Sequence, residues 1–207
     1  MTGFPQPPII GAGCENLAWV NATLASDATG GKHVILPGQM RPLRPDWRVV
    51  GRAFVVQACQ DDNLAVNNAV KAPPTPGCVL VVGGHATSRT ATIGDLMAHE
   101  FRNLGIAAIV TDGLIRDAQE LRDLGMPVWC RGTTPTASVK SDPGHVGGSA
   151  VVGGIVVRDG DYVFADDDGV VIWPHAELDA LVRNAEAKRD TDDARMIRLR
   201  ANAPENR

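Results

Sequence analysis

Two charged stretches contain the residues of this sequence that are best suited to chemistry. Arg116 and Asp117 stand side by side at the end of the segment VTDGLIRD (110–117), and Asp95 precedes Arg116 with twenty residues between them. A carboxylate can hold a divalent cation or take a proton, and a guanidinium binds an oxyanion. The three residues together would therefore suit a reaction in which negative charge develops on an oxygen.

The first stretch, Gly94 to Met97, has two interpretations. Asp95 can simply stabilise the start of a helix, because an acid in the first turn favours the helix dipole. Alternatively, Gly94 lets the backbone approach a ligand, and the free N–H groups of Leu96 and Met97 bind a carboxylate. The two interpretations are compatible, so this stretch alone decides nothing.

The second stretch is ambiguous in the same way. As structure, Asp117 would be a first-turn acid, and Arg116 could pair with Glu120 one turn further along the helix. A cation in the first turn opposes the helix dipole, however, so Arg116 is poorly placed for a purely structural role. We therefore favour a functional role for this pair.

The surrounding elements are expected to bring both stretches to one place. Apolar runs predict strands over 78–84, 106–113 and 126–132, and helical periodicity with a terminal glycine predicts helices over 94–105 and 114–125. This alternation indicates parallel strands joined by helical crossovers. Both helix starts should then lie at the same edge of the sheet, where α/β proteins bind ligands.

The rest of the chain indicates a mixed α/β domain rather than a pure Rossmann sheet. We expect one domain over 1–207, with an extended arm about 1–15 and a charged C-terminal helix about 175–200. Further predictions are a helix over Asn16–Ala28, two short strands around Gly51 (48–59), a helix over 61–72 and short strands with Asp-Gly turns over 155–174.

Composition excludes several classes of protein. The net charge of −4 comes without a basic stripe, and only 4% of residues are aromatic, so we expect no nucleic-acid partner. No apolar run approaches the roughly 20 residues of a membrane helix, and no signal peptide is visible. The cysteines form no C-x-x-C pair, as is typical of reduced thiols, so we expect a cytoplasmic protein.

Common catalytic motifs are missing from the sequence. There is no GxGxxG, P-loop, G-x-S-x-G or HExxH pattern, and the five histidines are scattered. His85, which follows Gly83 and Gly84 at the expected edge of the sheet, is a marginal site candidate.

The stretches GDLMA (94–98), GIAAIVTDGLIRD (105–117) and LGMPVWCRGTTP (124–135) together resemble a known family. They are similar to the class II pyruvate aldolases that cleave 4-hydroxy-4-methyl-2-oxoglutarate and 4-carboxy-4-hydroxy-2-oxoadipate. The same family includes RraA-like proteins, which are named for regulation of a ribonuclease. Further similar segments extend the resemblance over roughly residues 20–200, including 42–56, 76–84 and 157–174.

The resemblance implies a compact α/β fold with a central β-structure wrapped by helices, and a role for each residue of the two stretches. Gly94, Asp95, Leu96 and Met97 would form the turn whose N–H groups hold a pyruvyl carboxylate. Arg116 would contact the keto oxygen. Asp117 would be the single direct protein ligand of a divalent metal, Mg²⁺ or Mn²⁺, and Asp95 would orient a metal-bound water.

The resemblance also implies a homotrimer or hexamer with active sites at the subunit interfaces. In the aldolases, an acidic residue from a neighbour's C-terminal helix approaches the metal. Four residues in this region could do so: Glu186, Asp190, Asp192 and Asp193. A loop at TSRTAT (87–92) would touch the distal part of the substrate.

Two functions follow from the resemblance, and the sequence leaves both open. One is a metal-dependent aldolase (a lyase acting on small 2-oxo acids), with oxaloacetate decarboxylation as a side activity because both reactions pass through pyruvate enolate. The other is a non-catalytic RraA-like regulator that binds a ribonuclease or another protein. An acidic surface suits a partner with basic segments.

Overall fold

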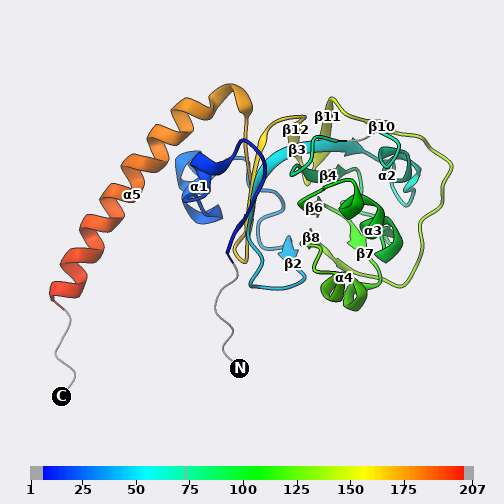
Figure 1. Ribbon diagram of the computed structural model, residues 1–207, viewed down its shortest axis with the longest axis horizontal. Helices are drawn as coiled ribbons and strands as arrows, with labels where there is room; N and C mark the ends of the chain where they lie inside the picture. Colours follow the sequence, from blue (N-terminus) through cyan, green and yellow to red (C-terminus); the bar gives the residue numbers. More distant parts are fainter. Residues whose placement is uncertain (1–6, 73, 203–207) are drawn as a thin grey trace, which may run out of the picture.

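Four parallel strands form the centre of the computed structural model, which describes residues 7–72 and 74–202 (Figure 1). They are β3 (Val49–Gln57), β4 (Val79–Gly83), β6 (Ala108–Thr111) and β8 (Val128–Cys130), and they lie in this order. Every residue of β4 and β6 is buried. Burial on both faces explains their continuous apolar runs, which are typical of parallel strands covered on each side.

Antiparallel strands extend this sheet. β13 (Tyr162–Asp166) pairs with β3, and β14 (Gly169–Trp173) pairs with β13 as a hairpin. On the other side, β2 (Arg41–Pro42) pairs with β8. β1 (Ile9–Ile10) pairs with the first two residues of β3, and β10 (His145–Val146) pairs with its last two. The result is a sheet of nine strands.

The sheet curls until its two edges meet. The indole Nε1 of Trp129 on β8 donates a hydrogen bond to the carbonyl oxygen of Asp166 at the β13–β14 turn, at 2.8 Å. Arg41 on β2 donates to the carbonyl oxygen of Asp167 at 3.3 Å. The enclosed face forms one apolar core, to which both edges contribute, for example through Trp129 and Ile172. The hairpin of β11 (Ser149–Val152) and β12 (Ile155–Arg158) packs into the same core.

Two groups of helices cover the outer face of the sheet (Figure 1). α2 (Leu64–Ala69), α3 (Asp95–Asn103) and α4 (Ala118–Leu124) share a core with β4, β6 and β8. α1 (Ala22–Ala28) and α5 (Leu178–Ala201) share another with β13 and β14. These layers confirm the predicted compact mixed α/β fold.

A second, smaller parallel sheet lies beside the first. It contains β5 (Ala91–Ile93), β7 (Leu114–Ile115) and β9 (Gly132–Thr133), in that order. Neither of its first two strands was predicted. Residues 114 and 115 were assigned to a helix and residues 91 and 92 to a loop, and a strand of two or three residues is too short to show a periodicity.

Five further predictions need correction. Residues 48–59 form one strand rather than two, because Gly51 lies within β3 and does not interrupt it. The glycine allows close packing, since an added Cβ would lie 2.9 Å from Val79 Cγ2. The expected helix over Asn16–Ala28 is a 3₁₀ turn, η1 (Glu15–Leu17), followed by α1, which Asn21 caps by accepting the N–H of Leu24 at 2.8 Å.

The helix expected over 61–72 is reduced to α2, and the C-terminal helix begins with a 3₁₀ turn, η2 (His175–Glu177). The N-terminal arm is also more ordered than expected, because Ile9 and Ile10 join the main sheet. Residues 1–6 of the arm lie outside the described part. No helix within 7–72 and 74–202 is long and apolar enough to cross a membrane.

Candidate active site

The small parallel sheet places the two charged stretches side by side. β5 ends at Ile93, immediately before Gly94, and β7 ends at Ile115, immediately before Arg116. Ile93 and Ile115 are partners in register, and the N–H of Arg116 donates to the carbonyl oxygen of Ile93 at 3.0 Å. The predicted convergence therefore occurs, but at the end of the small sheet rather than at the edge of the main one.

Asp117 turns its carboxylate away from its own helix and toward α3. It precedes α4 in a left-handed conformation, with φ 56° and ψ 42°, and does not cap that helix. Its Oδ2 instead accepts the N–H of Asp95 at 3.2 Å and lies 3.3 Å from Arg116 Nε. Left-handed non-glycine residues are strained and concentrate at functional sites.

Gly94 is required by this close approach. A Cβ at this position would lie 2.5 Å from Asp117 Oδ2 and 2.8 Å from Arg116 Nε. The backbone φ of Gly94 is −128°, which any residue can adopt. Space for the Arg116–Asp117 pair, and not backbone freedom, therefore explains the glycine.

The start of α3 offers two free backbone donors. The N–H of Asp95 is occupied by Asp117, whereas those of Leu96 and Met97 find no acceptor among the described residues. The first N–H groups of a helix carry partial positive charge and bind carboxylates. The side chain of Leu96 is 71% exposed, so it leaves this end of the helix open to a ligand.

A pocket of about 230 Å³ opens in front of these groups. Arg116, Gly94, Leu96 and Met97 line it on one side. Polar residues from α2 and the 137–140 segment also line it: Asn63, Asn67, Ser138 and Lys140. These four residues were not predicted from the sequence, because no spacing connects α2 with the 137–140 segment. Only the tertiary structure brings Lys140 into the same pocket as Arg116.

Asp62 fixes the segment that carries Lys140. This buried carboxylate accepts the N–H groups of Leu64, Ser141 and Asp142 at 2.7–2.9 Å, and also the Ser141 hydroxyl. Burial alone would raise the pKa of Asp62, but these hydrogen bonds outweigh it and hold the pKa well below its usual range. Asp62 is therefore an ionised clamp between α2 and the pocket wall.

The six predicted site residues thus lie together, although some details differ from prediction. Helix α4 begins at Ala118, so Arg116 lies before the helix rather than in its first turn. Arg116 pairs with Asp117 and not with Glu120. In the expected substrate loop 87–92, only Ala91 lines the pocket, and it belongs to β5.

His85 is fully buried, and burial lowers its pKa. Neither ring nitrogen has a hydrogen-bond partner among residues 7–72 and 74–202. Its ring does not line the pocket, so the structure does not support His85 as a site residue.

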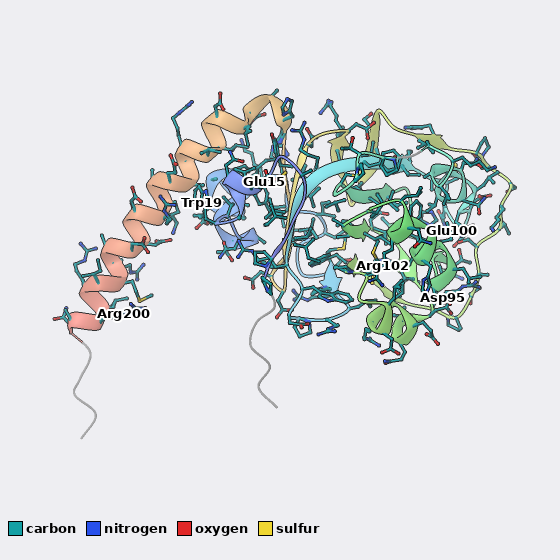
Figure 2. All side chains as sticks on the ribbon, in the orientation of Figure 1. Glu15, Trp19, Asp95, Glu100, Arg102 and Arg200 are labelled. Atoms are coloured by element: carbon teal, nitrogen blue, oxygen red, sulfur yellow. The ribbon has the colours of Figure 1, made fainter. Side chains whose placement is uncertain are left out.

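The C-terminal acids lie far from the site of their own chain. Figure 2 places Asp95 and Arg200 at opposite ends of the molecule. Asp192 pairs with Lys188 at 2.6 Å and Asp190 with Arg189 at 3.6 Å. Any approach of Glu186, Asp190, Asp192 or Asp193 to the pocket must come from another subunit.

The donor set fits a weakly coordinated, hydrated cation better than a closed metal cage. Among residues 7–72 and 74–202, no group of three or more His, Cys, Asp or Glu side chains could hold a metal ion. The Asp117 side chain is 33% exposed. Mg²⁺ keeps several waters and binds through one or two carboxylates plus substrate oxygens, which suits Asp117 with Asp95 nearby.

Comparisons with known proteins agree with the sequence resemblance. Residues 22–172 match the RraA-like family, described as Aldolase/RraA. A protein of Halalkalibacterium halodurans with the name "Putative 4-hydroxy-4-methyl-2-oxoglutarate aldolase" is 36% identical over 176 residues, which cover 85% of this chain and 83% of the relative. An Arabidopsis thaliana protein of the same name, numbered 3, is 32% identical over 145 residues, covering 67% of this chain and 87% of its own length.

Solved structures of the family share the fold. RraAS2 of Streptomyces coelicolor, described as an unusual member of the RNase ES inhibitor RraA protein family, superimposes with a TM-score of 0.75 at 30% identity, covering 86% of this chain and 93% of its own. The RNA-processing inhibitor RraA from Thermus thermophilus gives a TM-score of 0.65 at 29% identity, with coverages of 75% and 93%. The sequence match and the shared fold show that this chain belongs to the Aldolase/RraA family.

Proposed function

We propose that the chain is a divalent-metal-dependent aldolase that cleaves 4-hydroxy-4-methyl-2-oxoglutarate, or a related 4-hydroxy-2-oxo acid, to pyruvate. The proposal depends mainly on the contact of Asp117 Oδ2 with both Asp95 N–H and Arg116 Nε, at 3.2 and 3.3 Å, beside a polar pocket. The names of the Halalkalibacterium and Arabidopsis relatives support the substrate class.

The pocket can bind such a substrate along its whole length. The N–H groups of Leu96 and Met97 would donate hydrogen bonds to the carboxylate next to the keto group, and Arg116 Nη atoms would face the keto oxygen. Lys140 would meet the distal carboxylate, since it lines the same pocket. Charge-assisted hydrogen bonds of this kind fix orientation as well as affinity.

In the cleavage itself, the C4 hydroxyl loses a proton, the C3–C4 bond breaks, and the electron pair passes through C3 to the C2 oxygen of pyruvate enolate. Arg116 donates hydrogen bonds to that oxygen as its charge grows. Asp95, whose carboxylate makes no hydrogen bond among the described residues, takes the proton from the C4 hydroxyl and returns it to C3.

Asp117 would hold the metal, with Asp95 next to it. A bound divalent cation supplies Lewis-acid polarisation of the keto group and stabilises the enolate oxygen. Oxaloacetate decarboxylation would be a side activity, because it produces the same enolate at the same oxygen.

The test is release of pyruvate from 4-hydroxy-4-methyl-2-oxoglutarate, coupled to lactate dehydrogenase, with Mg²⁺, with Mn²⁺ and with excess EDTA. Oxaloacetate and the Asp117→Ala variant are measured in parallel. We expect metal-dependent turnover that Asp117→Ala loses. Turnover that survives EDTA or the substitution would contradict the metal site.

The second candidate is a non-catalytic regulator that binds a ribonuclease or another protein. The two RraA structures, described as inhibitors or members of an inhibitor family, favour it. Absence of turnover with both substrates, together with inhibition of a purified ribonuclease of the E type, would support this candidate instead.

A further inference from the structure

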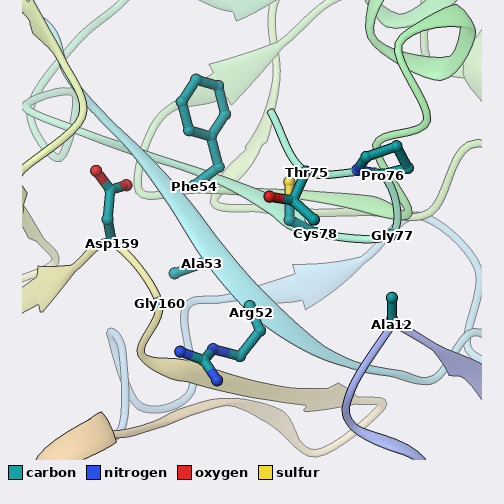
Figure 3. A pocket seen from close by; sticks show the side chains of 10 residues that line it. All are labelled: Ala12, Arg52, Ala53, Phe54, Thr75, Pro76, Gly77, Cys78, Asp159 and Gly160. Atoms are coloured by element: carbon teal, nitrogen blue, oxygen red, sulfur yellow. The ribbon is translucent and has the colours of Figure 1, made fainter. Parts of the chain in front are cut away.

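A second pocket of about 350 Å³ lies on the outer face of the main sheet, separate from the candidate active site. Its lining comes from β3 and from loops beside it, and includes no residue of a helix (Figure 3). Ten residues line it: Ala12, Arg52, Ala53, Phe54, Thr75, Pro76, Gly77, Cys78, Asp159 and Gly160. None of them lines the pocket beside Arg116.

Arg52 contributes to this pocket a guanidinium that forms no ion pair with the described residues. Tyr162 on β13 is its partner in register, and it holds the group in place. Arg52 Nη1 donates to the Tyr162 hydroxyl at 2.9 Å, and its Cζ lies 4.5 Å from the centre of the Tyr162 ring. Arg52 Nε is buried without a hydrogen-bond partner, and Arg52 forms no ion pair within the described residues.

Asp159 presents a carboxylate to the same pocket. Its Oδ1 accepts the N–H of Val55 at 2.8 Å and its Oδ2 accepts the N–H of Gly148 at 2.5 Å, so its position is fixed by the backbone. Gly160, the next residue, lies against the guanidinium, because a Cβ on this glycine would lie 2.9 Å from Arg52 Nη2. The two opposite charges therefore lie in one pocket without pairing.

The opposite wall of the pocket is apolar. In Figure 3, Arg52 and Asp159 lie on one side with Gly160 between them, and Cys78 and Pro76 lie on the other. Burial raises the pKa of the Cys78 thiol to about 11, so this wall carries no charge at neutral pH.

We propose that this pocket binds a small free amino acid with an apolar side chain. Its carboxylate meets Arg52, its ammonium group meets Asp159, and its side chain packs toward Cys78 and Pro76. Only a ligand with both charges satisfies the two fixed groups at once, since an anion alone would approach Asp159 and a cation alone would approach Arg52. The volume suits a ligand of this size.

Three ligands that differ by one group each would test this proposal by titration calorimetry: L-valine, isovalerate without the amino group, and isobutylamine without the carboxylate. We expect valine to bind with a Kd of about 1 mM. Each of the other two should bind at least about tenfold more weakly, the factor expected for one lost charge-assisted contact.

Two substitutions assign these differences to named groups. Arg52→Gln should weaken valine to the level of isobutylamine, and Asp159→Asn should weaken valine to the level of isovalerate. Asp159 is exposed, so its variant should fold even if Arg52→Gln does not, and Arg52→Lys provides a further folded comparison. Arg116→Ala serves as the control, because it removes carboxylate binding at the active site and should leave valine binding unchanged.

No heat of binding for valine up to about 50 mM, some fiftyfold above the expected Kd, would overturn the proposal. Equal affinity for all three ligands, or valine binding that is lost in Arg116→Ala but kept in Asp159→Asn, would overturn it as well. Because the assay measures binding alone, its result does not depend on the aldolase proposal.

Discussion

At the level of single residues, the most informative feature is that Arg116 and Asp117, which are adjacent and of opposite charge, have different roles. Arg116 and Asp117 lie 3.3 Å apart and are only partly exposed, at 41% and 33%. An exposed pair of this kind contributes little to stability. Its geometry is better explained by the ligands that each partner leaves room for, an oxyanion at Arg116 and a cation at Asp117.

The Arg116 role predicts a large effect from a conservative substitution. Arg116→Ala should lower kcat by about 10²–10³, as does removal of an oxyanion donor elsewhere. Arg116→Lys should recover little of this loss, because a compact ammonium cannot reproduce the planar fork of the guanidinium. Steady-state kinetics with saturating Mg²⁺ measures both, and near-wild-type turnover in Arg116→Lys would refute the assignment.

Substitutions at Asp117 can distinguish the effect of its left-handed backbone on stability from the role of its carboxylate in turnover. Asp117→Ala, Asp117→Asn and Asp117→Gly all remove the carboxylate and should all lose metal-dependent turnover. The Asp117→Gly variant should nevertheless be more stable than Asp117→Ala, with a free energy of unfolding about 1 kcal/mol higher, since alanine is strained at positive φ. Urea denaturation measures this order, and equal stability of the two would show that residue 117 is not left-handed in solution.

At the scale of elements, the site depends on pieces too short to be recognised in the sequence. β5 and β7 have three and two residues, and they align Ile93 with Ile115. A single buried clamp, Asp62, then holds the segment with Lys140 against α2. The position of Lys140 is therefore tied to a group that titrates at low pH.

Asp62 predicts a specific pH dependence of stability. Its pKa is lowered in the folded protein, so its contribution is complete above about pH 4, the unfolded pKa of an aspartate, and declines as the pH falls further. Asp62→Asn should cost about 2 kcal/mol at pH 7, because it removes an ionised acceptor of several hydrogen bonds. It should also flatten the loss of stability below pH 4.

Urea midpoints at pH 7, 4 and 3 measure this effect. Asp167→Asn, a change at an exposed acid in the β13–β14 turn, is the matched control and should leave both the midpoint and its pH dependence unaltered. A midpoint for Asp62→Asn that falls with pH as steeply as that of the wild type would show that Asp62 is not the titrating clamp.

At the scale of the whole molecule, α5 reaches away from the body of its subunit (Figure 1). Leu181 and Ala185 are buried against the chain, but Met196, Ile197 and Leu199 near the end of the helix are exposed by 47%, 69% and 56%. We propose that another subunit covers them in a homotrimer or hexamer, and that α5 brings an acid to the neighbouring site.

Mixed oligomers test this arrangement. One chain carries Arg116→Ala, and the other carries Glu186→Gln with Asp190→Asn, Asp192→Asn and Asp193→Asn. Each alone should have reduced turnover, and co-assembly should restore part of the activity, because some sites combine an intact pocket with an intact helix. Light scattering and two different affinity tags confirm that mixed oligomers form; if they form without any recovery, the acids do not serve a neighbour's site.

Local patterns in the sequence were sufficient to predict the layered α/β fold and the identity of the central residues. Long apolar strands and helices ended by glycine, such as α3 before Gly105, are fixed by local periodicity and backbone preference. The spacing of Asp95 from Arg116 and Asp117 was equally local information, and the structure places those residues in contact.

Other features depend on contacts that form only in the folded chain. They are the left-handed turn at Asp117, the short strands β5 and β7, and the meeting of Lys140 with Arg116 in one pocket. These features come from contacts between segments far apart in the chain, which outweigh the weak local preferences of two or three residues. The second pocket belongs with them, since residues of β3, the 75–78 segment and the 159–160 turn line it together.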